Sequence, residues 1–150
     1  MDSEHIDAVL LAEWILKSAA GQNCFMTNSK LQILLYYSQA WYLAFYRRIL
    51  FDASVEAWIH GPAVYSVYKH FETRSFLCLH IRKSLPEIPG RVKLHLNEVL
   101  EVFLPFQTGN LEEMVKNEQA WQNARKGLSP CDSSRTIISL EEIQRFYSKK

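Results

Sequence analysis

The stretch from Leu31 to Phe45 constrains the fold of this chain more than any other, because it is apolar on almost every side and only Gln32, Ser38 and Gln39 interrupt it. No Pro or Gly breaks the surrounding run from Lys30 to Arg48, and a run of that length favours a helix over a strand. A helix that is apolar all round must be buried, in its own domain or in a bilayer. The run is too short and too rich in Tyr for a bilayer. We therefore expect it to be the central helix of a soluble core.

The start of this central helix carries a capping signal. Ser29 is placed to cap the helix, and Gln32 three residues on completes the S-x-x-Q form of the capping box. Thr27 and Asn28 are alternative caps. An earlier helix is expected over Ile6–Ala19, because apolar residues recur there at helical spacing.

The rest of the chain predicts helices and very little strand. Gly21 is placed to end the first helix as a left-handed cap. Residues 55–60 alternate weakly between apolar and polar, which indicates a short strand or an extended segment. Gly61-Pro62 is expected to form a turn, with its Pro at the first position of the next helix. Helices are expected over residues 62–71, 92–103, 111–116, 119–126 and from 140 onward.

Two further features concern strands and caps. The irregular segment 72–91 contains a candidate strand at 76–81. Ile137-Ile138 could add a second short strand and pair with residues 55–60. Ser139 is expected to cap the last helix, with Glu142 completing a second capping box.

Length and composition are consistent with one globular domain. A chain of 150 residues, of which 48% are hydrophobic, can bury a sizeable core. With the helical patterns, this predicts a mainly α, compact single-domain helical fold over residues 1–150, built around a buried central helix, with a small two-stranded β element as an option. The net charge of +1 implies no general attraction to nucleic acid or membrane. Three widely spaced cysteines and an acidic N-terminal stretch predict a cytoplasmic protein.

No residue pattern points to catalysis, a cofactor or a metal ion. Four of the 5 histidines lie at positions 60, 70, 80 and 95, and none is three or four residues from another, as a helical metal pair requires. Isolated histidines that satisfy local hydrogen bonds explain these positions better. The sequence contains no Gly-rich phosphate loop, no G-x-S-x-G and no H-E-x-x-H. We therefore expect a protein that is not an enzyme and has no cofactor, metal site or catalytic residue.

Aromatic content and uneven charge indicate surfaces for a protein partner. Six aromatic residues lie on the central helix, more than a narrow buried face needs, and Tyr and Trp left at a surface are typical interface anchors. Residues 69–95 carry six Lys or Arg against two Glu, whereas residues 98–118 carry five Glu against one Lys. Solvated helix and loop faces explain this asymmetry simply. The functional alternative is a basic loop that meets an acidic partner or phosphate.

Two adjoining sequence blocks are distinctive when they occur together. Thr27 precedes KLQILLYYSQAWYL, which begins at Lys30, and LFDASVEAWIHGPAVYSVY begins at Leu50. These blocks resemble the Panacea antitoxin domain, also described as SocA-like or GepA-like and long known from phage-associated proteins. The resemblance is strong over residues 27–68 and extends more loosely from about residue 6 to 147.

The resemblance implies an antitoxin of a toxin–antitoxin system, which neutralises a cognate protein toxin by direct binding. It also implies an alternative, a proteolytic adaptor that delivers its toxin to a cytosolic AAA+ protease. A prophage-derived regulator that binds nucleic acid is a further alternative, although a nucleic-acid binder would usually carry a stronger basic stripe. Neither the identity of the toxin nor the oligomeric state follows from the sequence.

Candidate partner-binding residues lie near the central helix and the basic segment 69–95. Trp, Tyr and Arg are the side chains that most often anchor protein interfaces. The candidates on this basis are Arg47, Arg48, Trp58, His60 and Tyr65.

Overall fold

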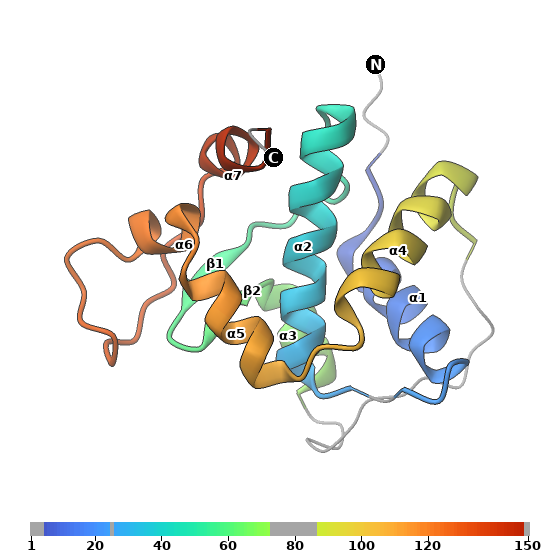
Figure 1. The fold of residues 1–150 in the computed structure, drawn as a ribbon, viewed down its shortest axis with the longest axis horizontal. Coiled ribbons are helices and arrows are strands. Elements are labelled where there is room, and N and C mark those ends of the chain that lie inside the picture. Colours follow the sequence, from blue (N-terminus) through green and yellow to red (C-terminus); the bar gives the residue numbers. More distant parts are fainter. Residues whose placement is uncertain (1–4, 25, 73–86, 149–150) are drawn as a thin grey trace.

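The computed structural model describes residues 5–24, 26–72 and 87–148 of the chain, and over these residues the fold is mainly helical (Figure 1). Its helices and strands, in chain order, are α1 (Ala8–Ala20), α2 (Asn28–Tyr46), β1 (Glu56–Trp58), β2 (Gly61–Ala63), α3 (Tyr65–Phe71), α4 (Gly90–Phe103), α5 (Thr108–Lys116), α6 (Gln119–Ala124) and α7 (Leu140–Ser148). The two strands form one small antiparallel sheet. The predicted fold class, mainly α around a buried central helix with a two-stranded β element, is confirmed.

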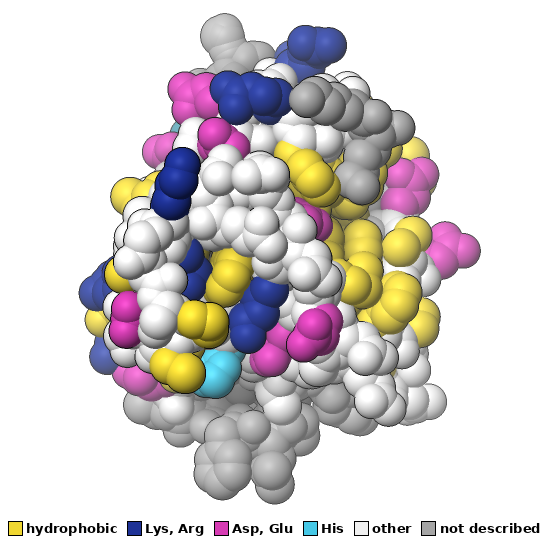
Figure 2. All heavy atoms as spheres, turned by 60° about the vertical axis from the view of Figure 1, so that its left-hand side comes forward, with side chains coloured by type: hydrophobic (Ala, Val, Ile, Leu, Met, Phe, Trp, Pro, Cys, Tyr) yellow, Lys and Arg dark blue, Asp and Glu magenta, His cyan; other side chains and the backbone are white. Residues whose placement is uncertain are grey.

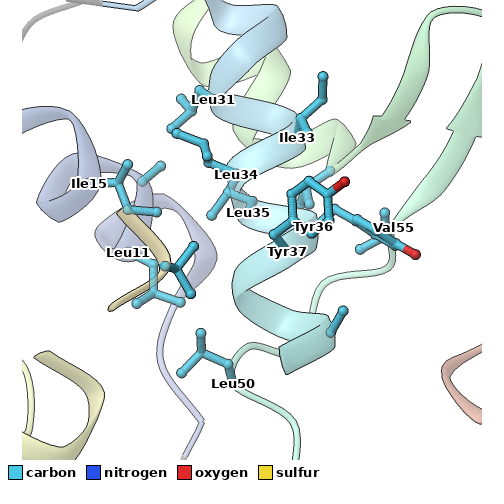
Figure 3. Packing of buried hydrophobic residues seen from close by; sticks show 14 of the residues in the cluster. Leu11, Ile15, Leu31, Ile33, Leu34, Leu35, Tyr36, Tyr37, Leu50 and Val55 are labelled. Carbon is cyan, nitrogen blue, oxygen red and sulfur yellow. The ribbon is translucent and has the colours of Figure 1, made fainter. Parts of the chain in front are cut away.

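Helix α2 is the centre of the molecule, as its apolar sequence predicts. Figure 1 shows α2 between α1 and α4 on one side and α5, α6 and α7 on the other. Every residue from Lys30 to Ala40 is buried. Figure 3 shows Leu11 and Ile15 of α1 against one side of α2, with Tyr36 and Tyr37 on the opposite side. A helix in this position has no solvent face over most of its length, which explains why its sequence lacks a polar stripe.

The ends of the first two helices differ in detail from the prediction. Thr27, one of the alternatives to Ser29, is the N-cap of α2, and its hydroxyl accepts a hydrogen bond from the Lys30 N–H at 3.3 Å. Gly21 follows α1 but has an ordinary right-handed φ of −64°, so the predicted left-handed cap is wrong at that residue. The left-handed conformation occurs two residues later, at Asn23 with φ 61°. Asn tolerates this conformation because its short polar side chain bonds locally.

The β-hairpin corrects the prediction for Gly61-Pro62. The turn lies at Ile59-His60, and Gly61-Pro62 belongs to β2, where Pro62 stands opposite Ala57. The Ala57 carbonyl accepts a hydrogen bond from Arg125 Nη1 at 3.1 Å, and the Ala57 N–H donates to the Thr136 carbonyl at 2.7 Å. Pro62 therefore faces a residue that needs no N–H donor from it. Gly61 has φ 143°, a backbone conformation that other residues rarely adopt.

The predicted pairing of residues 55–60 with Ile137-Ile138 is confirmed. Glu56 and Ile137 form an antiparallel bridge, and the Ile138 N–H donates to the Val55 carbonyl at 2.7 Å. This contact joins the C-terminal part of the chain to the hairpin. Helix α3 begins at Tyr65 rather than at Pro62, because Pro62 is held in the strand.

The later helices fall close to the predicted ranges. Helix α4 begins at Gly90 and ends at Phe103, just ahead of Pro105. Ser139 accepts a hydrogen bond from the Glu142 N–H at 3.3 Å, which confirms it as the cap of α7. The Glu142 carboxylate bonds to Asn123 and Arg145 at the same time. The candidate strand at 76–81 lies outside the described residues.

Candidate functional site

The polar side chains of the first sequence block hold the core together. The Lys30 ammonium, which is buried, donates to the backbone carbonyls of Leu104 at 2.8 Å and Phe106 at 2.7 Å. These carbonyls lie at and just after the C-terminal end of α4, where the helix dipole favours a positive charge. Lys30 therefore fastens α4 to α2 and is not available to a ligand.

The two buried glutamines of the same block have a similar role. The Gln32 side-chain oxygen accepts a hydrogen bond from the Val64 N–H at 2.8 Å. The Gln39 amide donates to the Phe51 carbonyl at 2.8 Å and accepts from the Leu50 N–H at 2.6 Å. Each side-chain amide thus makes hydrogen bonds to buried backbone groups that water cannot reach. These motif residues position the chain that follows α2 and do not form a reactive site.

The five predicted partner-binding residues fall into two separate groups. Trp58, His60 and Tyr65 lie in or beside the hairpin, which packs near Ile33 in the first half of α2. Arg47 and Arg48 are exposed residues at the far end of α2, where Arg47 is the left-handed cap. Arg47 follows Ile33 by fourteen positions, which corresponds to roughly 21 Å along a helix.

Two residues of the hairpin group, Trp58 and Tyr65, contact three further residues. We name the five together the hairpin cluster: Glu56, Trp58, Tyr65, Tyr68 and Arg135. The Glu56 carboxylate accepts hydrogen bonds from Trp58 Nε1 at 2.7 Å, Arg135 Nε at 2.9 Å and Arg135 Nη2 at 3.2 Å. The Arg135 guanidinium lies 3.9 Å from the centre of the Tyr65 ring. Partial burial opposes the ionised form of Glu56, but the bonds from Arg135 and Trp58 outweigh it and lower the Glu56 pKa.

A shallow hollow of about 200 Å³ lies beside the hairpin cluster, and Trp58, His60, Tyr68 and Gln32 are among its lining residues. Within the described parts of the chain, no three His, Cys, Asp or Glu side chains gather in a way that could hold a metal ion.

A second surface, which the sequence did not predict, lies beside α2, where α4 borders one part of it and α5 and α7 border the other. It consists of two neighbouring hollows that share Trp41 and Phe103, and we name it the α2–α4 groove. The apolar hollow, of about 280 Å³, is lined by Trp41, Phe45, His95, Glu98, Val99, Val102 and Phe103. The polar hollow, of about 410 Å³, is lined by Tyr37, Trp41, Phe103, Met114, Asn117, Glu118, Phe146 and Tyr147.

The walls of the groove expose large apolar side chains to water. Phe45 is 62% exposed and Val102 is 56% exposed, although both line the apolar hollow. Figure 2 shows hydrophobic side chains gathered in the right-hand part of that view, with acidic side chains beside them. A contiguous apolar surface next to charged residues is typical of a protein-binding site.

Three tyrosines around the polar hollow differ in their hydrogen bonding. The Glu118 carboxylate accepts from the hydroxyls of Tyr36 and Tyr147, each at 2.7 Å. The Tyr37 hydroxyl is buried and makes no hydrogen bond with any described residue, and its ring stacks on Phe103 with centroids 4.1 Å apart. Burial, with a contribution from the Glu118 charge, raises the pKa of Tyr37, so the hydroxyl keeps its proton. It can therefore still donate or accept a hydrogen bond.

His95 forms part of the wall of the apolar hollow and is buried. Its Nε2 lies 2.9 Å from the Ser38 carbonyl oxygen, which assigns the proton to Nε2 in the neutral ring. Burial lowers the His95 pKa, and the bond to Ser38 and the charge of Glu98 only partly oppose this shift. His95 is thus a buried, uncharged ring that packs between α4 and α2.

A scan against protein-family models matches residues 31–122 to the family described as "Antitoxin SocA-like, Panacea domain". The chain belongs to this family. The match covers more than half of the chain and confirms the predicted resemblance. Searches of curated proteins and of solved structures gave no match.

The matched region places the Panacea domain on the structure. Residues 31–122 run from the first turn of α2 into α6, and therefore include the first sequence block from Leu31 onward, the whole second block, the hairpin and the α4 wall of the groove. Helix α7, which contributes Phe146 and Tyr147 to the polar hollow, follows the matched region. Among the described residues, no helix has both the length and the apolar character needed to cross a bilayer.

One sequence signal could have located the groove. Tyr37, Trp41 and Phe45 are spaced four residues apart and therefore share one face of α2. The excess of aromatic residues on this helix predicts interface anchors, but the sequence does not show which of these residues are exposed and which are buried. Only the packing of α4 and α7 against α2 distinguishes them.

Proposed function

We propose that this Panacea-domain protein is a non-enzymatic antitoxin that acts in the cytoplasm and neutralises a cognate protein toxin by direct binding. Membership of the antitoxin SocA-like family is the observation that carries this proposal. The exposed aromatic and apolar residues beside α2 support it, since such residues supply most of the energy of protein interfaces.

The proposed mechanism is occlusion, in which the antitoxin covers the active site of the toxin or holds it in an inactive form. A typical stable interface covers about 800 Å² on each partner. A toxin silenced in this way requires binding of about −12 kcal/mol, which corresponds to a nanomolar dissociation constant. Trp58, His60 and Tyr65 at the hairpin and Arg47 and Arg48 at the end of α2 are proposed as contacts that add to this surface.

Growth rescue tests the proposed function directly. The adjacent gene is expressed alone, together with this protein, and together with an early-stop variant of it as the control. Toxicity alone, rescue on co-expression and co-purification of the two proteins are expected. A harmless neighbour that does not co-purify would contradict the antitoxin assignment.

The presence of two separate surfaces favours one alternative, the proteolytic adaptor. An adaptor needs one face for its cargo and another for the protease, and the hairpin cluster and the α2–α4 groove are formed by different elements. Measuring toxin half-life distinguishes the two mechanisms. An adaptor shortens the half-life in cells that contain the AAA+ protease, whereas a simple inhibitor leaves the toxin intact in a stoichiometric complex.

A further inference from the structure

We propose that the α2–α4 groove binds an amphipathic helix of the partner protein, one that carries a row of apolar side chains and a Lys or Arg beside that row. This inference deepens the proposed function and rests on it, because it names the antitoxin surface and the chemistry of the toxin segment. Three properties of the groove carry it: its apolar walls, an unused hydroxyl and its charge.

The apolar walls lie on helices, and their spacing suits another helix. Tyr37, Trp41 and Phe45 follow one another at four-residue intervals along α2, so they span roughly 12 Å of one helix face. A partner helix that lies along this face presents its own side chains at the same intervals. Val99 and Val102 of α4 form the opposite wall of the apolar hollow. The apolar side chains of a partner helix would therefore contact α2 on one side and α4 on the other.

The polar hollow offers a hydrogen bond that the protein does not use. Tyr37 is 2% exposed and lines this hollow, and its hydroxyl has no hydrogen-bond partner among the residues that the structure describes. A buried polar group without a hydrogen bond lowers the stability of the protein. A partner group that bonds to it removes this energetic penalty. A Lys ammonium or an Arg guanidinium carries only donors, and a tyrosine hydroxyl accepts a hydrogen bond from either.

The charges along the groove favour a basic partner. Glu98 lines the apolar hollow and Glu118 lines the polar hollow. No described Lys or Arg lines either hollow, and His95 is neutral because burial lowers its pKa. Apolar walls concentrate the field of these carboxylates within the groove, which attracts a cationic side chain and disfavours an acidic one.

The same charges argue against a second copy of this chain as the occupant. Two copies that met through this surface would each bring the Glu98 carboxylate of α4 to the interface. Like charges brought together in this way weaken association. A partner helix with a basic side chain supplies the opposite charge.

A designed peptide tests the groove without knowledge of the toxin. The probe is a capped helical peptide of about 20 residues, with Leu at positions i, i+4 and i+7 and one Lys beside that row, a length at which helices become stable in water. A matched peptide has Glu in place of the Lys. Isothermal titration calorimetry is expected to show binding of the Lys peptide and about fivefold weaker binding of the Glu peptide. No detectable binding of the Lys peptide at about 1 mM overturns the proposal.

Matched variants of α4 then locate the binding site. Val102→Asp places a charge in the apolar hollow and is expected to weaken peptide binding at least tenfold. Leu94→Asp is the control, because Leu94 is 61% exposed on the same helix but lines neither hollow. Glu98→Lys and Glu101→Lys form a second pair, of which only the first should weaken binding. Equal effects of Val102→Asp and Leu94→Asp overturn the proposal.

Tyr37→Phe tests the unused hydroxyl. This variant removes one oxygen and leaves the aromatic wall, so about tenfold weaker binding of the Lys peptide is expected, with little change for the Glu peptide. An equal loss for both peptides contradicts the proposed bond to the basic side chain. Light scattering of the protein alone examines self-association, and a dimer that Val102→Asp dissociates would overturn the choice of a partner helix.

The peptide and growth-rescue experiments fail independently. If the peptide binds in the groove but the adjacent gene product is neither toxic nor captured, the proposed antitoxin function is contradicted and the proposed binding site in the groove is supported. If the toxin is captured equally well by the wild type and Val102→Asp, the function stands and the groove is overturned. Rescue by Leu94→Asp but not by Val102→Asp supports both.

Discussion

The hairpin cluster and the α2–α4 groove both contain aromatic side chains at the surface, but they differ in how completely their bonding groups are used. In the hairpin cluster, the Glu56 carboxylate bonds to both Trp58 and Arg135, and the Arg135 guanidinium stacks on Tyr65. In the groove, the Tyr37 hydroxyl has no hydrogen-bond partner within the described ranges, and Phe45 is 62% exposed. The hairpin network stabilises the free protein, whereas the groove retains capacity to bind another molecule.

This difference shows that exposed aromatic residues should be ranked as candidate binding residues by how much of their surface and bonding capacity is not already used within the protein. Tyr65 is 38% exposed, but one face of its ring is already covered by Arg135. A partner that contacts Tyr65 must work around an existing contact. A partner that contacts Phe45 replaces only water, so it gains the full benefit of apolar burial.

The largest expected effect is on stability, at the carboxylate beneath the polar hollow. Glu118→Ala leaves the Tyr36 and Tyr147 hydroxyls without their acceptor in a buried site. Loss of two charge-assisted hydrogen bonds should reduce the free energy of unfolding by about 3 kcal/mol. Urea denaturation measures this change. Glu113→Ala, at an exposed position on α5, is the control, and similar midpoints for the two variants would contradict the role of Glu118.

The next effect concerns binding and compares the two surfaces directly. Phe45→Asp should weaken capture of the co-expressed toxin about 30-fold or more, because it places a charge among apolar contacts. Tyr65→Asp should weaken capture by about threefold or less. Surface plasmon resonance with purified toxin measures both affinities. A larger loss for Tyr65→Asp would reverse the ranking of the two surfaces.

Two tyrosine variants sharpen the comparison within the groove. Tyr147→Phe removes a hydroxyl that donates to Glu118, and it should reduce the free energy of unfolding by about 1.5 kcal/mol. Tyr37→Phe removes a buried hydroxyl without a partner, so stability should stay the same or rise slightly. Thermal denaturation of the two variants provides the measurement. Equal destabilisation would show that Tyr37 has a partner in solution.

A smaller effect is expected from acid, through His95. Its folded-state pKa is below the ordinary value of 6.5, mainly because it is buried. Below about pH 6.5 the unfolded chain binds a proton that the folded protein does not, so stability should fall as the pH decreases through this range. Above about pH 6.5, His95 is neutral in both the folded and the unfolded protein, so it no longer makes stability depend on pH. His95→Gln should flatten this part of the stability profile, and His60→Gln, at an exposed turn, is the control.

The smallest effect is expected at the surface of the hairpin cluster. The Arg135 side chain is largely exposed, although the Glu56 carboxylate that it pairs with is mostly shielded, so Arg135→Ala should lower the urea midpoint less than Glu118→Ala or Tyr147→Phe does. High salt should reduce the difference further. A loss above about 2 kcal/mol would show that the cluster is as critical to the fold as Glu118, which would remove the contrast between the two regions.

Local rules were sufficient for some elements and failed for others. The burial of α2 could be predicted because no orientation of that helix presents a polar face. The turn at Gly61-Pro62 was predicted wrongly, since Gly and Pro favour turns but also fit the strand position opposite Ala57, whose N–H bonds to Thr136. That alternative depends on a segment about 80 residues later in the chain, which local propensity does not include.

The predicted contact residues remain a hypothesis, but their placement illustrates the same limit. Residue type identified good anchors, and it did not show that Arg47 and Trp58 lie at opposite ends of α2. The groove was missed because it depends on the way α4 and α7 pack beside α2. Amphipathic patterns predict which face of a helix is buried, but they do not show where two helices leave a space.

The sequence by itself determined the buried central helix, the mainly α class and the Panacea family, because these follow from apolar periodicity and from two contiguous motifs. Tertiary structure alone decided the roles of Tyr36 and Tyr37, which are identical neighbours in the chain. Tyr36 bonds to Glu118, 82 residues away, whereas Tyr37 points to a hollow without a partner group. Successive residues of a helix point about 100° apart, so their surroundings are set by whichever distant segments pack on each side.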